Sequence, residues 1–202
     1  MQVTNLKQKG KSQEYFLEID NLPYGTLQLE TIYKHKIQVG TNLNEDEFKQ
    51  IKEEDGELSC FSCALKYISS RLKTEYQMKQ YLLQKGYCLS TVEKAILKLK
   101  DYGYLNDEYF AKTFIELESK NKGKRYLKQQ LFLKGVNSQI VEDVILDNND
   151  EQACKNVCQK WLRSKEQPLT QKDKEKLYRF LLSRGFEYDT IKHTTGELFT
   201  GE

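Results

Sequence analysis

The feature that most constrains the fold is a six-residue phrase that occurs three times in 202 residues. The three copies are LLQKGY at 82–87, LFLKGV at 131–136 and LLSRGF at 181–186. Their glycines, Gly86, Gly135 and Gly185, are separated by 49 and 50 residues. A period of this length is typical of tandem helical repeats, in which each unit buries its apolar face against its neighbours. The sequence therefore predicts three successive copies of one structural unit.

Each phrase has the pattern expected at the end of a helix. Apolar residues stand eight, four and three positions before each glycine, which places them on one helix face. They are Met78, Leu82 and Leu83, then Leu127, Leu131 and Phe132, and last Leu177, Leu181 and Leu182. A cation precedes each glycine, where the helix dipole favours it. The glycine itself fits the left-handed position that follows a helix, so replacing Gly135 with alanine should cost about 1 kcal/mol.

Helical patterns also flank each of these segments. Val92, Val141 and Ile191 follow their glycines by six residues and predict a third helix. Apolar periodicity from Glu57, Asp107 and Asp150 predicts the first helix of each unit. The predicted caps are Thr74 with Gln77, Ser90 with Glu93, and Asn106 or Asp107. The expected fold is therefore mainly α, with three-helix repeats at 57–103, 104–148 and 149–202 that form an elongated, curved solenoid.

Residues 1–56 differ from the repeats. VTNL at 3–6 and YFLEID at 15–20 flank a polar stretch and predict a β-hairpin-like extension. NLPYG at 21–25 predicts a turn, and TLQLETI at 26–32 predicts a third strand. A short helix is expected to begin at Asn44 and to break at the Asp55–Glu57 segment. Because an isolated hairpin is only marginally stable in water, this region must pack on something else.

The charge of the chain is distributed unevenly. Residues 1–63 contain 7 basic and 11 acidic residues, residues 64–134 contain 15 and 7, and residues 135–202 contain 10 and 12. The middle segment is thus net +8 in a chain that is net +2 overall. A basic middle indicates an anionic partner, with nucleic acid the first candidate. The alternative is a set of solvated helix faces that have no partner.

Several classes of function have no support in the sequence. There is no phosphate-binding loop, dinucleotide fingerprint or HExxH motif, and the two histidines are isolated, so we expect neither an enzyme nor a cofactor. Cys60 and Cys63, like Cys154 and Cys158, have helical spacing, which favours core packing over a metal site. The five cysteines are an odd number, which favours reduced thiols. No apolar run is long enough for a bilayer, so a cytoplasmic protein is expected.

Three segments together resemble a known family. ALKYISSRLKTEYQMKQYLLQKGY, VEKAILKLKDYGYLNDEYFAKTF and GKRYLKQQLFLKGV resemble the RecX regulatory proteins in order and spacing, over about residues 60–195. The resemblance implies a monomeric, non-catalytic regulator of DNA repair, recombination and the SOS response. Such a regulator binds the RecA filament on single-stranded DNA and mostly inhibits its ATPase and strand exchange.

Some members of the family also bind single- or double-stranded DNA directly, so the alternative function is that of a stand-alone nucleic-acid-binding helical repeat. The chain departs from the family pattern at NKGKRYL, which lacks a glycine-proline step, and most strongly in the third repeat, which contains Trp161.

The candidate partner-binding residues form two basic clusters at equivalent junctions. They are Arg71, Lys73 and Lys79 in the first repeat, and Lys120, Lys122, Lys124, Arg125 and Lys128 in the second. One side of a solenoid would then face DNA phosphates or an acidic protein surface. The alternatives are solvated helix ends and, for Arg71, an i, i+4 pair with Glu75.

Aromatic residues crowd the boundary between the first and second repeats. They are Tyr102, Tyr104, Tyr109 and Phe110. Aromatic side chains at such a boundary favour an inter-repeat core, in which tyrosine rings are buried and their hydroxyls stay in water. The alternative is a surface on which bases stack.

Overall fold

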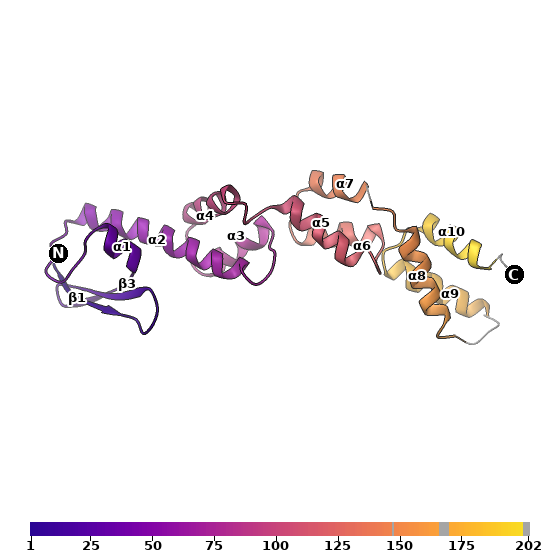
Figure 1. Cartoon of the computed structure of the whole chain (residues 1–202), viewed down its shortest axis with the longest axis horizontal. Coiled ribbons are helices and arrows are strands. Elements are labelled where there is room, and N and C mark those ends of the chain that lie inside the picture. Colours follow the sequence, from indigo (N-terminus) through magenta and orange to yellow (C-terminus); the bar gives the residue numbers. More distant parts are fainter. Residues whose placement is uncertain (147, 166–169, 200–202) are drawn as a thin grey trace. The chain divides into compact units, whose positions relative to one another are not determined.

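The computed structural model describes residues 1–146, 148–165 and 170–199 and contains a small antiparallel sheet followed by helices (Figure 1). Contacts divide the chain into two compact units, Met1–Arg71 with Met78–Tyr104, and Leu72–Gln77 with Leu105–Glu202. The prediction of a mainly α fold with three-helix units and an N-terminal β extension is confirmed. The expected division at 103/104 and 148/149 stays a prediction.

The strands are β1 (Val3–Gln8), β2 (Glu14–Ile19) and β3 (Leu22–Gln28), and they pair in this order. The β2–β3 turn is formed by Asp20 and Asn21, which have φ of 51° and 64°. Both residue types tolerate the left-handed region, so β3 begins at Leu22 and the turn predicted at NLPYG is wrong. The predicted third strand is correct only for residues 26–28, because α1 (Leu29–Lys34) follows directly.

Helix α2 (Glu45–Ile68) runs without interruption through Gly56, so the predicted break is wrong. The expected boundary between residues 56 and 57 therefore lies inside a helix. Phe48 and Ile51 in its first half belong to the core beneath the sheet, whereas Cys60 and Ala64 in its second half are buried in the first repeat. Burial on both sides of Gly56 outweighs the roughly 1 kcal/mol that glycine costs within a helix.

Asp55 joins α2 to the sheet. Its side chain is buried, and Oδ1 accepts hydrogen bonds from the Gln28 N–H and the Thr31 hydroxyl, both at 2.7 Å. The carboxylate thereby satisfies donors at the start of α1, where the helix dipole favours negative charge. This contact explains how the β extension is held to a helix of the repeat region.

Replacement of Asp55 by alanine should lower the free energy of unfolding by about 1–3 kcal/mol, because a buried hydroxyl and a half-buried N–H lose their acceptor. Asp55→Asn keeps an oxygen at the same place and should cost less. Urea denaturation followed by circular dichroism provides the comparison. Equal losses for the two variants would contradict this role for the oxygen.

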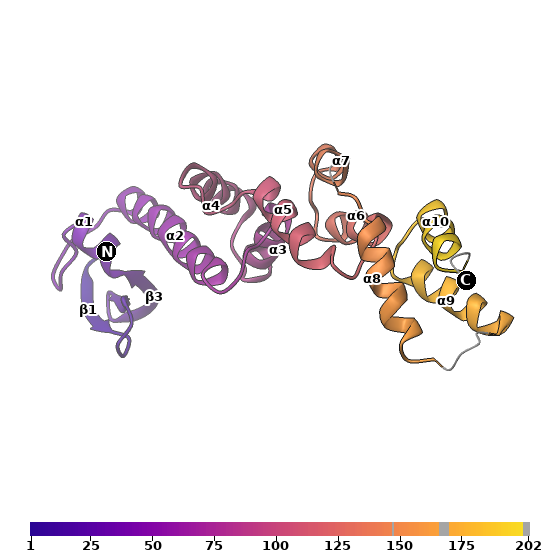
Figure 2. The ribbon, with the colours of Figure 1, turned by 45° about the vertical axis from the view of Figure 1, so that its right-hand side comes forward.

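The remaining helices form the repeats. They are α3 (Glu75–Gln84), α4 (Leu89–Asp101), α5 (Asp107–Glu118), α6 (Lys124–Leu133), α7 (Ser138–Leu146), α8 (Glu151–Leu162), α9 (Gln171–Ser183) and α10 (Tyr188–Phe199). Helices α5, α6 and α7 enclose one core, and α8, α9 and α10 enclose the next (Figure 2).

The predicted helix face is correct at two of its three offsets. The residues eight and four positions before each glycine are all fully buried. The third offset is wrong for Phe132 and Leu182, which are 41% and 37% exposed. The residue three positions before each glycine directly follows the buried leucine, and successive residues of a helix are rotated by about 100° about its axis. Its side chain therefore lies at the edge of the core.

The predicted left-handed glycines are confirmed, with φ of 90°, 79° and 84° at Gly86, Gly135 and Gly185. At Gly135, the glycine N–H donates to the Phe132 carbonyl at 2.9 Å, and the Val136 N–H donates to the Leu131 carbonyl at 3.1 Å. This pair of hydrogen bonds is a Schellman motif.

The predicted caps differ in outcome. The Thr74–Gln77 box is present, with hydrogen bonds of 3.3 and 3.1 Å, and Asn106 caps α5 through the Tyr109 N–H. The box predicted at Ser90 is wrong, because α4 begins two residues earlier than that box requires and has Cys88 at its N-cap without a side-chain capping bond.

At two of the glycine turns, the first turn of a helix from the preceding repeat packs directly against the glycine. At Gly135, an added Cβ would lie 2.2 Å from the Cβ of Tyr76, near the start of α3. The Thr74 hydroxyl donates to the Lys134 carbonyl at 2.6 Å, and the Glu75 N–H donates to Asp107 Oδ1 at 2.8 Å. The turn and an aspartate of the second repeat thus bind the first turn of α3.

The same junction recurs at Gly185. The Gly123 N–H donates to the Arg184 carbonyl at 3.0 Å, and the Arg125 N–H donates to the Gly185 carbonyl at 3.1 Å. Asp150, which is buried, accepts from the Lys124 N–H at 2.9 Å. An added Cβ on Gly185 would lie 2.4 Å from the Cβ of Tyr126. Each junction therefore needs the absence of a side chain as well as a left-handed φ.

Gly86 offers a matched control for Gly135, because the space around its Cα is open among the described residues within 4 Å. Gly86→Ala should cost about 1 kcal/mol for its positive φ alone. Gly135→Ala should cost about 1–3 kcal/mol more, since the new methyl group meets Tyr76. Equal shifts of the two urea midpoints would contradict the close approach.

Candidate functional site

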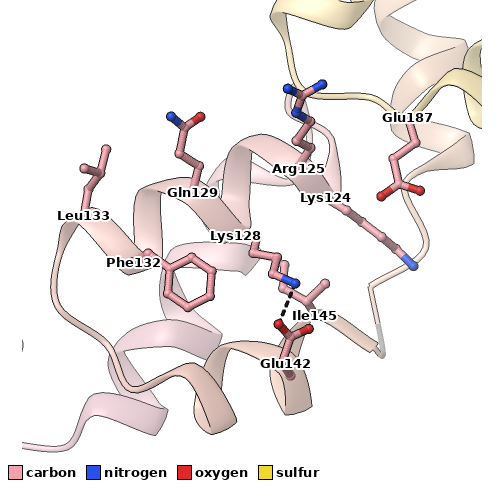
Figure 3. A pocket seen from close by; sticks show the side chains of 9 residues that line it. All are labelled: Lys124, Arg125, Lys128, Gln129, Phe132, Leu133, Glu142, Ile145 and Glu187. Carbon is pink, nitrogen blue, oxygen red and sulfur yellow. Dashed lines mark ion pairs between the residues drawn. The ribbon is translucent and has the colours of Figure 1, made fainter.

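An open groove of about 690 Å³ lies between α6 and α7 and is called the α6–α7 groove (Figure 3). Helix α6 contributes Lys124, Arg125, Lys128, Gln129, Phe132 and Leu133, helix α7 contributes Glu142 and Ile145, and Glu187 precedes α10. The structure thus brings together three of the eight predicted basic residues. The other six lining residues were missed, because their spacing in the sequence does not reveal that α6 and α7 face one another.

Positive and negative charges mix in this groove. Lys128 Nζ lies 2.5 Å from Glu142 Oε1 and 6.0 Å from the centroid of the Phe132 ring. Lys128 and Phe132 extend toward α7, whereas Arg125 and Gln129 project away from it (Figure 3). Leu133 is 67% exposed. Apolar side chains within a charged rim are typical of surfaces that bind proteins.

The other predicted basic residues lie elsewhere. Arg71 and Lys73 stand in the loop before α3, so Arg71 and Glu75 do not lie on one helix. Lys79 is on α3 and forms a 3.3 Å ion pair with Glu93. Lys120 is exposed after α5. Lys122 lies over the Tyr126 ring at 4.1 Å and lines a separate groove with residues of α8 and α9.

The predicted aromatic core at the repeat boundary is wrong for all three tyrosines. Tyr102, Tyr104 and Tyr109 are 58%, 54% and 59% exposed. Of the four aromatic residues only Phe110 is buried, where it belongs to the core of the second repeat. The tyrosines flank the glycine turn after α4 and the start of α5, where a side chain points outward at little cost.

The cysteines are free thiols in three different environments. Cys60, Cys154 and Cys158 are buried as predicted, Cys63 is half-buried and Cys88 is exposed. Burial raises the pKa of Cys60 to about 12 and that of Cys158 to about 11. Hydrogen bonds from Ser90 and Thr91 lower the pKa of Cys88 to about 7. Among the described residues, no group of three or more His, Cys, Asp or Glu side chains is placed to hold a metal ion.

Cys88 should therefore be the fastest thiol to react with an aromatic disulfide reagent in the native protein. Because the thiolate is the nucleophile, the rate should rise with pH and reach half its maximum near pH 7. Cys88→Ser should remove this phase. A fast phase that persists in Cys88→Ser, or a midpoint near pH 9, would contradict the assignment.

The fold places the chain in the class of tandem three-helix repeat proteins. Models of RecX domains match two parts of it, the first three-helix domain at residues 60–99 and the third three-helix domain at residues 149–194. A regulatory protein RecX of Clostridium botulinum strain Eklund 17B is 32% identical over 99% of this chain and 97% of its own length. One of Clostridium perfringens strain SM101 is 34% identical over 86% of this chain and 84% of its own length. The chain belongs to the RecX regulatory protein family.

Solved structures support the fold. A crystal structure of regulatory protein RecX is similar over 96% of this chain and 98% of its own, with a TM-score of 0.71 and 18% identity. RecX from Lactobacillus salivarius is similar over 73% of this chain and 99% of its own, with a TM-score of 0.67 and 23% identity. Among the described helices, none is both long enough and apolar enough to span a bilayer.

Proposed function

We propose that this protein is a non-catalytic, cytoplasmic regulator that binds the RecA filament on single-stranded DNA as a monomer and mostly inhibits its ATPase and strand exchange. Membership of the RecX family supports the partner. The observation that supports a contact with the recombinase is the α6–α7 groove, which combines exposed apolar side chains with charges of both signs.

The groove suits a folded protein partner for two reasons. Phe132 and Leu133 expose apolar surface whose burial would provide the main favourable free energy. Lys124 and Arg125 lie at the open rim, where charges mainly increase the rate and specificity of association. The internal Lys128–Glu142 pair leaves Lys124 and Arg125 as the better candidates for a partner's carboxylates.

The basic test adds the protein in increasing amounts to RecA, single-stranded DNA and ATP, and measures ATP hydrolysis and strand exchange. Both rates should fall as the amount of protein rises. Unchanged rates up to stoichiometric amounts would refute the proposed function.

The groove itself is tested by the double variant Lys124→Glu/Arg125→Glu. Reversal of both rim charges should raise the concentration needed for half-maximal inhibition roughly tenfold or more, because attraction becomes repulsion. The matched control is Lys172→Glu/Lys192→Glu, which makes the same charge change at two exposed positions outside both grooves.

Circular dichroism melting curves verify that both double variants are folded. If the rim variant inhibits as well as the control does, the recombinase contact is not at this groove.

A further inference from the structure

A second groove lies in the third repeat, and none of the lining residues except Lys122 was predicted. It measures about 430 Å³ and is called the Trp161 groove. Trp161 and Phe180 provide aromatic side chains from α8 and α9. Three cations lie around them, namely Lys122 before α6, Lys160 on α8 and Arg184 after α9.

The positive charge of this groove is largely uncompensated. Among the described residues that line it, Glu118 is the one carboxylate. Within the described part of the chain, Lys122, Lys160 and Arg184 form no ion pair within 4.0 Å. In the α6–α7 groove, by contrast, Lys128 is paired with Glu142 and a second carboxylate, Glu187, also lines the surface. An anion entering the Trp161 groove therefore does not have to break an existing pair.

The cations of this region lie close to aromatic faces. Arg184 Cζ is 5.0 Å from the centroid of Phe180, and Lys165 Nζ is 5.1 Å from that of Trp161. Both rings are half-buried, so each is held by packing while part of it stays accessible. Phe180, whose ring can stack on a base, and Arg184, which can bind a phosphate, are thus neighbours in one groove.

We infer that the Trp161 groove is a binding site for single-stranded DNA, in which a base stacks on Trp161 or Phe180 while Lys122, Lys160 and Arg184 bind the adjacent phosphates. Aromatic side chains combined with a positively charged groove are the usual means of binding single strands without sequence preference. An acidic peptide would meet the same cations, but only a nucleic acid carries a planar ring beside every negative charge of its backbone. The double helix is disfavoured because its bases are stacked on one another.

This site is separate from the recombinase contact and is tested without RecA. Trp161 is the single tryptophan of the chain, so intrinsic fluorescence reports on the groove directly. Titration with an oligothymidylate of roughly 15 nucleotides should quench this fluorescence saturably. Three phosphate contacts predict that the logarithm of affinity falls with the logarithm of salt concentration with a slope of about −2.

Variants then separate stacking from simple charge attraction. Trp161→Ala should weaken binding of a fluorescein-labelled oligothymidylate roughly five- to hundredfold in anisotropy, whereas Trp161→Phe keeps a ring and should lose less. Lys160→Glu removes one exposed cation and should also weaken binding and flatten the salt dependence. Lys172→Glu/Lys192→Glu again serves as the charge control and should bind within twofold of the unaltered protein.

Two further ligands identify the source of affinity. An abasic oligonucleotide of the same length should bind more weakly than oligothymidylate, and a duplex should quench Trp161 less. The inference is overturned if oligothymidylate causes no quenching at low salt, if the abasic strand binds equally well, or if the duplex is preferred. It is also overturned if Lys160→Glu binds like the charge control. These outcomes leave the RecA assay unaffected, so failure of one proposal is distinguishable from failure of the other.

Discussion

The rest of the repeat structure depends on the contact between a glycine turn and the first turn of a helix from the preceding repeat. Tyr76 packs against Gly135, and Tyr126 packs against Gly185, so closely that neither glycine has room for a side chain. A buried or half-buried aspartate then accepts an N–H from the arriving helix. At Gly135 and Gly185 one structural motif therefore both ends a helix and joins two repeats, whereas the turn at Gly86 only ends a helix.

The same junction divides the basic run at 120–128. Gly123 is bound to the Arg184 carbonyl, so the chain is held where it enters α6. Lys122, just before this point, lines the Trp161 groove, whereas Lys124 and Arg125, just after it, line the α6–α7 groove. Residues two positions apart thus belong to surfaces of different chemistry, one with charges of both signs and exposed apolar side chains, the other aromatic and more positively charged.

The errors of the sequence-based prediction share one physical cause. Gly56 was expected to end a helix, and the tyrosines at 102–109 were expected to be buried, because both expectations treat residue type as decisive. Burial of α2 residues before and after Gly56 compensates for the glycine, and the three tyrosines stay exposed while Phe110 joins the core of the second repeat. Local preference amounts to about 1 kcal/mol per residue, which a well-packed neighbour readily outweighs.

Sequence alone determined the period, the three-helix unit, the buried offsets at Met78 and Leu82 and their counterparts, and the left-handed glycines, because these follow from helix geometry over a few residues. Family membership was also readable from three spaced segments. The tertiary structure decided which residues share a surface. Trp161 and Arg184 join Lys122 across about 40 to 60 positions of sequence, and no local pattern encodes such a meeting. It depends on how helices pack, and therefore only the folded chain distinguishes a groove from a run of charges.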